Sequence, residues 1–313
     1  MTTIANSQKI YKRHGGAIDG VLLLDKPSGM TSNDAVQRIK KLFHVKKAGH
    51  TGGLDPLANG MLPICLGEAT KFAQYLLDAD KAYYVKVRLG VRTASGDSEG
   101  AIIAERPIPK ITKRLLRKIL SSFRGVIEQT PPMYSAVKYK GQPLYKLARQ
   151  GIEVERKPRQ VTIDELNLLD WNEKEAELHV HCSKGTYIRT LVDDLGEALN
   201  CGAHIIALRR LMVMYYRENQ MISLARLEQR YDESNLTALD LHLLPIESMV
   251  LNFPALQLNR LATFYLQKGL AMMVPHAPAS GFVRLRNHND DFIGIGEVLH
   301  DARIAPRRLI KQP

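Results

Sequence analysis

The sequence of 313 residues predicts an α+β fold with a small β-rich unit at its C-terminal end. Strand-like and helix-like periodicities alternate irregularly along the chain, which disfavours a regular βαβ winding. The length suits one large domain followed by a small one. Beyond residue 250, short strand-like pieces are separated by Gly, Pro and Asn, a pattern typical of a small β-barrel.

The N-terminal part of the chain predicts an arm, a strand, a helix and a loop. Residues 1–17 are expected to form a basic arm, and the apolar run 21–24 a short buried strand. Thr31 and Ser32 can cap a helix, because apolar side chains follow them at helical spacing as far as Phe43. Residues 49–60 contain four glycines and a proline, so they predict a long loop.

Clear periodicities continue through the middle of the chain. Apolar side chains three and four residues apart predict helices, and strict alternation of apolar and polar side chains predicts strands. The expected helices cover 68–77, 115–123 and 186–199, the expected strands 83–89 and 176–182, and a turn-rich stretch 131–149. A boundary near residue 250 would leave a large domain at 18–250 and a small one at 251–313.

The charge balance points to a polyanionic partner. The chain has 44 Lys and Arg against 32 Asp and Glu, a net charge of +12, and a pI near 9.5. A basic surface attracts RNA or DNA, although charge alone does not distinguish such a protein from one that is merely basic. A membrane surface is disfavoured, because no long basic amphipathic helix carries Trp and Phe on one face.

Cysteine usage and hydropathy indicate a cytoplasmic protein. Cys65, Cys182 and Cys201 are odd in number and have no CxxC spacing, so neither a disulfide framework nor a zinc site is expected. The longest early apolar run is too short for a signal-peptide core or a membrane span.

The glycine-rich loop holds the first candidate for catalysis, Asp55 in the segment GHTGGLDP at 49–56. Glycines let a backbone approach a ligand closely, and a carboxylate on such a loop can act as a nucleophile or base. The structural alternative is that Asp55 and Pro56 simply start a helix, and spacing alone favours it. A Walker motif is excluded, because no GKS or GKT ending follows.

Three further segments have both a functional and a structural interpretation. Tyr83 lies on the apolar face of its strand, where it could be a core side chain or could stack on a base. Arg189 follows a strand-to-helix junction and could pair with a buried carboxylate, or be an exposed helix residue. Leu208, beside Arg209 and Arg210, could pack in the core or line a pocket.

Together these segments resemble the TruB-type tRNA pseudouridine synthases. The resemblance spans nearly all of residues 18–250, and its HTGxLDPLAxGxLP block is highly specific. One departure is Gly53, where Ala or Thr is more usual, and it should affect only loop stiffness. The tail from 251 looks like a PUA domain, a weaker match. The matching segments are LDKPSGMTS at 24–32, the block at 50–72, and residues 81–90, 129–136, 185–189 and 202–211.

This resemblance implies a mixed, largely antiparallel sheet flanked by helices, the pseudouridine synthase fold. It also implies isomerisation of the uridine at position 55 in the T arm of tRNA. The C1′–N1 bond breaks and a C1′–C5 bond forms after the base has been flipped into the site. No cofactor or metal is implied. tRNA would be the only partner, with no protein partner and no membrane, and a monomer suits a site that takes one tRNA.

The resemblance also assigns roles to individual side chains. Asp55 is the essential carboxylate, which could add to the sugar or base or remove a ribose proton. Arg189 is its charge partner, and Tyr83 stacks on the flipped uracil and could handle the proton at C5. The remaining candidates would line the pocket or contact displaced nucleotides, with two as weaker supports for phosphate or loop: His50, Tyr187 and Leu208, then Lys26 and Lys71.

Three other interpretations remain open at this stage. A pure RNA-binding or RNA-folding protein would have the same surface and an idle site. A base-excising glycosylase would share base flipping but release free uracil. A guide-RNA-dependent synthase subunit would need accessory proteins.

Overall fold

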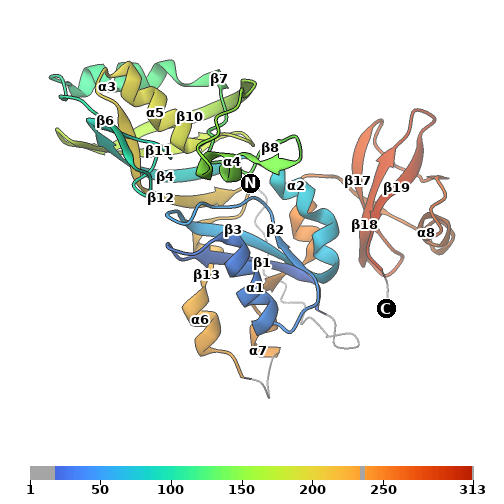
Figure 1. Cartoon of the computed structure of the whole chain (residues 1–313). Helices are drawn as coiled ribbons and strands as arrows, with labels where there is room; N and C mark the ends of the chain where they lie inside the picture. Colours follow the sequence, from blue (N-terminus) through green and yellow to red (C-terminus); the bar gives the residue numbers. More distant parts are fainter. Residues whose placement is uncertain (1–17, 233–236, 312–313) are drawn as a thin grey trace.

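The computed structural model of this chain describes residues 18–232 and 237–311. The expected basic arm at 1–17 lies outside the described residues. Figure 1 shows a large sheet with helices on its faces and, beside it, a smaller C-terminal sheet. In the described part, no helix is both long and apolar enough to span a membrane.

Ten strands form the large sheet. Its main path is β13-β1-β3-β12-β4-β11-β10-β7, with β14 paired to β1 and β2 paired to β3. All these pairs are antiparallel except β1–β13 and β3–β12, which confirms the expected mixed, largely antiparallel sheet. The strands are β1 (Gly20–Lys26), β2 (Ala48–His50), β3 (Asn59–Leu66), β4 (Lys81–Leu89), β7 (Gly125–Gln129), β10 (Arg159–Trp171), β11 (Glu175–Cys182), β12 (Ala203–Val213), β13 (Ile222–Ser223) and β14 (Leu243–Leu244).

Side-chain alternation places two cores on opposite faces of the sheet. In β1, Leu22 and Leu24 belong to the larger core, whereas Val21 and Leu23 belong to a second core. Successive side chains of a strand point to opposite faces, so a wholly apolar strand needs cover on both sides. The strict alternation of buried positions in β11 (EAELHVHC) fits a strand with one covered face.

Three helices, α1, α3 and α5, lie where the sequence predicts helices. α1 (Ser32–Leu42) begins after Thr31, whose side chain accepts a hydrogen bond from the Asp34 amide. α3 (Lys113–Ser122) and α5 (Ile188–Ala198) pack together at one end of the sheet. The remaining helices are α2 (Ala73–Leu77), α4 (Leu144–Arg149), α6 (Leu224–Gln229) and α7 (Thr237–Asp240), with 3-10 turns η1 (Gly67–Phe72), η2 (Glu218–Gln220) and η3 (Ile246–Val250).

The structure refines several expectations. The loop expected at 49–60 is shorter, because β2 and β3 take its ends. The helix expected at 68–77 divides into η1 and α2. The turn-rich stretch 131–149 contains a small hairpin of β8 (Lys138–Tyr139) and β9 (Gln142–Pro143) followed by α4. A second hairpin pairs β5 (Val91–Thr93) with β6 (Ile102–Glu105).

The C-terminal unit has five strands in the order β15-β17-β18-β19-β16 and its own apolar core. β15 and β16 are its edges, so the expected small barrel is a curled, open half-barrel. Helix α8 contacts β16 and β19. The elements are β15 (Ala255–Gln257), α8 (Arg260–Gln267), β16 (Met272–Met273), β17 (Gly281–Arg286), β18 (Phe292–Val298) and β19 (Arg303–Leu309).

A buried ionic cluster fastens this unit to the large domain. Glu247 in η3 accepts hydrogen bonds from Arg284 Nη1 at 2.7 Å and from Arg286 Nη2 at 2.6 Å. Its side chain is only 12% exposed. Phe72 of η1 and Phe292 of β18 add a ring contact, with centroids 5.8 Å apart. Charged and apolar contacts therefore both hold the two sheets together.

Candidate active site

The loop at 51–58 lies where β3 and β12 run parallel, at the centre of the large sheet. Asp55 does not cap a helix, because the loop continues into β3, so the structural alternative for this residue is wrong. The Leu54 amide donates to Ser32 Oγ at 2.7 Å, and Ser32 Oγ donates to the Leu54 carbonyl at 3.0 Å. The first residue of α1 thus fixes the loop beside Asp55.

Arg210 fixes the same loop from the other side. Its guanidinium donates to the carbonyls of Met61 at 2.6 Å, Gly52 at 3.0 Å and Gly53 at 3.3 Å. The side chain is 1% exposed, so these hydrogen bonds to carbonyls compensate for burying the guanidinium charge away from water. β12 passes so close to β3 that a Cβ on Gly60 would lie 2.4 Å from the Arg210 carbonyl oxygen. This close passage lets Arg210 reach the loop.

Asp55 pairs with Arg189, as the resemblance implies. Arg189 Nε lies 2.8 Å from Asp55 Oδ2, and the guanidinium also donates to the Ser95 carbonyl at 2.8 Å and to the Tyr134 carbonyl at 2.7 Å. The Arg189 side chain is 6% exposed, whereas that of Asp55 is 41% exposed. Asp55 is therefore the member of the pair that a substrate can reach.

The pKa of Asp55 reflects two opposing effects. Removal of water by the surrounding protein raises its pKa above the ordinary value, and the Arg189 charge and hydrogen bond lower it. Asp97 adds a like charge that raises this pKa, and Lys26 an opposite charge that lowers it. The net direction is upward, so Asp55 is a more basic carboxylate than one in water.

Asp97 is a member of the site that the sequence does not reveal. It lies in the turn between β5 and β6, is 4% exposed, and its Oδ2 is 3.8 Å from Arg189 Nε. Ser95 Oγ donates to Asp97 Oδ1 at 2.5 Å, and the Glu99 amide donates to the same oxygen at 3.1 Å. The segment TASGDSEG has the composition of an ordinary polar turn, so only the fold brings this carboxylate to Arg189.

Tyr83 lies on β4 opposite Arg210 of β12 and is 7% exposed. Burial raises the pKa of its hydroxyl to about 12, although the charge of Arg210 and a hydrogen bond from it act in the opposite direction. The hydroxyl is therefore protonated at neutral pH. The ring belongs to the larger core, together with Leu54 and Leu208.

Lys26 and His50 lie on the elements that flank the loop. Lys26 is fully buried and donates to the carbonyls of Pro27 at 2.8 Å and Met30 at 2.6 Å. Burial lowers its pKa to about 8, and Asp55 is the main opposing charge. The pKa of His50 is lowered by burial and then by Arg210, so its ring is neutral at pH 7. Its Nδ1 is buried without a hydrogen-bond partner among the described residues.

The remaining candidates lie in different places. Tyr187 directly precedes α5, and the Arg159 guanidinium lies 4.7 Å above the centre of its ring. Leu208 is a β12 residue, 8% exposed. Lys71 Nζ contacts Glu68 Oε2 at 2.5 Å and the Leu309 carbonyl at 3.1 Å. These Lys71 contacts lie between η1 and β19, so the structure does not bring Lys71 together with Asp55.

The chemistry available is that of a carboxylate among buried cations. Among residues 18–232 and 237–311, no group of three His, Cys, Asp or Glu side chains is placed to hold a metal ion. All three cysteines are buried and free. A partly exposed carboxylate next to a rigid guanidinium can act as a nucleophile or base, and the buried cations stabilise negative charge that develops nearby.

Comparison with family profiles gives three adjoining matches. The TruB family pseudouridylate synthase N-terminal domain matches residues 40–188. The tRNA pseudouridylate synthase B C-terminal domain matches 189–251, and the pseudouridine synthase II TruB C-terminal domain matches 254–310.

Individual proteins give the same result. The chain is 70% identical over 310 residues to tRNA pseudouridine synthase B of Coxiella burnetii strain Dugway 5J108-111, which covers 99% of both chains. It is 51% identical to the protein of the same name from Serratia proteamaculans, over 96% of this chain and 97% of that one.

Solved structures share the fold. A chain in the crystal structure of a Cbf5-Nop10-Gar1 complex superposes with a TM-score of 0.71 at 26% identity, over 93% of this chain and 84% of that chain. A chain from an H/ACA RNP bound to a substrate RNA containing 2′-deoxyuridine gives a TM-score of 0.70 at 23% identity, over 94% and 85%. These findings confirm the predicted fold and enzyme class: the chain is an isomerase and belongs to the TruB family of pseudouridylate synthases.

Proposed function

We propose that this chain converts uridine to pseudouridine at position 55 in the T arm of tRNA. Family membership and the name shared by the curated relatives support the tRNA substrate. The net charge of +12 supports a polyanionic partner. The reaction is internal to one nucleotide: the C1′–N1 bond breaks, the same base turns, the C1′–C5 bond forms, the C5 proton leaves and N1 takes up a proton.

The observation that carries the proposal is the pairing of Asp55 with Arg189. The N–H···O⁻ contact of 2.8 Å keeps the carboxylate oriented, and the two backbone contacts of Arg189 keep the guanidinium in place. The partial exposure of Asp55 leaves it open to a nucleotide. In this proposal Asp55 performs the bond chemistry on the sugar or base, and Arg189 keeps it ionised.

Neighbouring side chains receive and orient the base. The uridine must leave its stack to reach Asp55, since the carboxylate is fixed on the loop. Tyr83 is close enough for the charge of Asp55 to act on its pKa, and its protonated hydroxyl can donate a hydrogen bond or relay the C5 proton. In this proposal His50 contacts a displaced nucleotide, and Leu208 and Tyr187 form pocket walls.

The C-terminal half-barrel is proposed to be a PUA-like RNA-binding domain. It has 8 Lys and Arg against 4 Asp and Glu from residue 251 onward. The Glu247 cluster keeps it in a defined orientation to the large domain. We propose that one monomer in the cytoplasm acts on one tRNA without a protein partner.

The test uses unmodified tRNA transcripts tritiated at C5 of uracil. We expect wild-type protein to release one tritium per tRNA into water and to leave the base attached to the RNA. A transcript with cytidine at position 55 should release none. Release of free uracil would instead identify a glycosylase, and tritium release from the cytidine-55 transcript would place the modified uridine elsewhere.

A further inference from the structure

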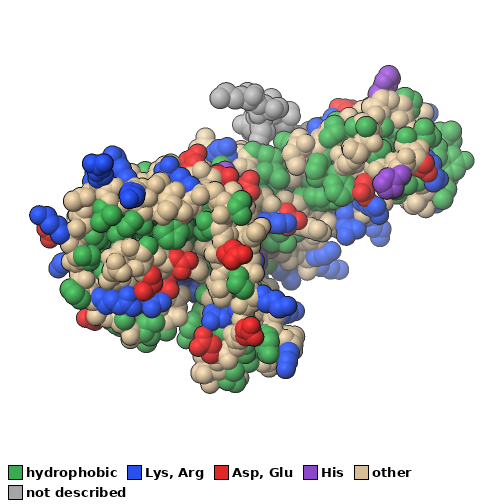
Figure 2. Space-filling view, turned by 90° about the horizontal axis from the view of Figure 1, so that it is seen from above, with side chains coloured by type: hydrophobic (Ala, Val, Ile, Leu, Met, Phe, Trp, Pro, Cys, Tyr) green, Lys and Arg blue, Asp and Glu red, His purple; other side chains and the backbone are tan. Residues whose placement is uncertain are grey.

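Helix α3 carries a concentration of positive charge outside the proposed active site. Between Arg106 and Ile127 the chain has seven Lys and Arg and no Asp or Glu. Four of these cations lie on α3 and are exposed, and none forms an ion pair with another described residue: Lys113, Arg114, Arg117 and Lys118. Figure 2 shows Lys and Arg side chains at the end of the molecule where Figure 1 places α3.

The arrangement of these charges opposes the stability of the helix. Lys113 and Arg114 occupy the first turn, where the helix dipole favours acidic side chains, and the last turn has no basic residue. Lys113 and Arg117 are four residues apart, as are Arg114 and Lys118, so like charges face each other along the helix. This charge pattern does not stabilise the helix. A pattern that opposes stability is typical of a functional surface.

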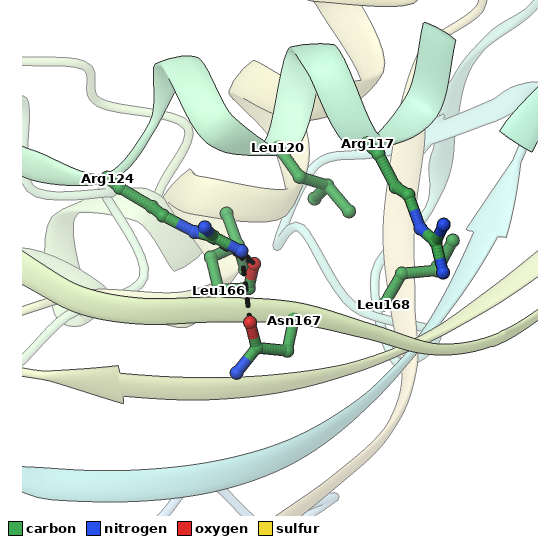
Figure 3. A pocket seen from close by; sticks show the side chains of 6 residues that line it. All are labelled: Arg117, Leu120, Arg124, Leu166, Asn167 and Leu168. Atoms are coloured by element: carbon green, nitrogen blue, oxygen red, sulfur yellow. Dashed lines mark hydrogen bonds between the residues drawn. The ribbon is translucent and has the colours of Figure 1, made fainter. Parts of the chain in front are cut away.

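Beside these charges α3 and β10 enclose a hollow of about 330 Å³. Figure 3 shows Arg117 and Leu120 of α3, and Arg124 of the segment that follows this helix, beside Leu166, Asn167 and Leu168 of β10. Arg124 is anchored, because its Nη2 donates to the Leu166 carbonyl at 2.7 Å and to Asn167 Oδ1 at 3.0 Å. Two guanidinium groups above a partly apolar floor suit a phosphodiester and its sugar.

We propose that the exposed cations of α3, together with this hollow, form a second RNA-binding surface that holds the phosphate backbone of the tRNA bound at the active site. The proposal rests on the proposed tRNA substrate. α3 packs against α5, the helix whose first turn contains Arg189, and its buried side chains belong to the same core as Tyr83, so α3 covers the same side of the large sheet as the active site. The contacts are to phosphates, so they add affinity but carry no base specificity.

The test neutralises an opposed pair and compares it with a matched pair elsewhere. The α3 variant is Arg114→Gln with Lys118→Gln. The control is Lys41→Gln with Arg226→Gln, which also removes one Lys and one Arg, but from the last turns of α1 and α6, where the helix dipole favours them. Binding of unmodified tRNA is measured over a range of salt concentrations, and the thermal midpoint Tm is measured for each protein.

We expect the α3 variant to bind tRNA about tenfold more weakly at low salt, which corresponds to about 1.4 kcal/mol. The slope of log affinity against log salt should fall in magnitude by about 1.5, since two phosphate contacts are lost. Its Tm should stay the same or rise, and kcat at saturating tRNA should not change. The control should keep wild-type affinity and slope.

Equal affinity and salt slope in the two variants would overturn the proposal. A fall in Tm or in kcat of the α3 variant would also overturn it, because it would show a structural role for these charges. Arg117→Gln supplies an independent variant at the hollow and should weaken binding in the same way. Wild-type protein that binds tRNA but forms no pseudouridine would refute the proposed function and leave this surface standing.

Discussion

Arg189 and Asp55 form a contact of 2.8 Å in which the arginine is fully constrained and the aspartate is not. The guanidinium is held by two backbone carbonyls and is 6% exposed, whereas Asp55 is 41% exposed on a loop. A preorganised charge of this kind acts on its partner without rearrangement during the reaction. The ionisation and orientation of Asp55 therefore depend on a residue that need not touch the substrate.

Removing the Arg189 charge should shift the pH dependence of turnover. The Asp55 pKa is already raised by burial, and Arg189 lowers it, so Arg189→Gln should raise it further. Catalysis by ionised Asp55 is lost as pH falls through this pKa, so the acid limb of kcat should move to higher pH. Arg189→Lys, which keeps the charge, should move it less. An unchanged acid limb in Arg189→Gln would contradict the role.

Replacing Tyr83 with Phe should slow the reaction and leave tRNA affinity nearly unchanged. The ring and its packing remain, but the protonated hydroxyl next to Arg210 is lost. We expect a decrease in kcat of about 10²-fold or more if the hydroxyl relays the C5 proton. Tyr84→Phe is the control, because Tyr84 points to the other face of β4 and is partly exposed. Wild-type turnover in Tyr83→Phe would show that the hydroxyl is not needed.

A methyl group at Gly60 should disrupt both the fold and the site. Its Cβ would lie 2.4 Å from the Arg210 carbonyl oxygen, and its φ is +96°. Gly29 also has positive φ, +77°, but nothing lies within 4 Å of its Cβ. Gly29→Ala should cost about 1 kcal/mol of unfolding free energy from strain, and Gly60→Ala about 3 kcal/mol or more once the clash is added. If urea denaturation gave the same loss of unfolding free energy for Gly60→Ala as for Gly29→Ala, the close passage of β3 and β12 would be refuted.

Glu247→Gln should loosen the C-terminal half-barrel. Removing a carboxylate that is 12% exposed leaves Arg284 and Arg286 with an uncharged acceptor. We expect a loss of about 3 kcal/mol in unfolding free energy and a higher KM for tRNA, with kcat retained. Glu297→Gln, which breaks a more exposed pair with Arg307, should cost about 0–1 kcal/mol. An equal loss of unfolding free energy in Glu247→Gln and Glu297→Gln would contradict the claim that Glu247 holds the half-barrel to the large domain.

The sequence predicts the elements whose pattern is local. α1 and β4 follow directly from apolar spacing, and the Thr31 cap is visible in the sequence. The long strand β12 is not predicted, because its neighbours β3 and β4 are distant in sequence and decide which of its faces is buried. Periodicity therefore predicts whether a segment is a helix or a strand. It does not predict which strands pair, so it does not predict the order of strands in the sheet.

The candidate site divides in the same way. Asp55, Tyr83 and Arg189 lie in motifs that a reader can recognise, and the fold brings them together. Asp97 acts through a long-range contact across a hairpin turn, so no local pattern marks it. Arg210 lies in a matching segment, but its contacts with the loop carbonyls depend on the pairing of β12 with β3, which the sequence does not show. Lys71 is expected only as a weaker support for phosphate or loop, and its contacts join η1 to β19.

Asp55 is the centre of the proposed chemistry, and one measurement tests it most directly. Wild-type protein and Asp55→Asn are each incubated with tRNA tritiated at C5 of uracil, and tritium release and tRNA binding are followed together. Asparagine keeps the size of the side chain and removes its negative charge. We expect Asp55→Asn to bind tRNA nearly as well as wild type and to release no tritium. Release at even a modest fraction of the wild-type rate would contradict the assignment of Asp55 as the essential carboxylate.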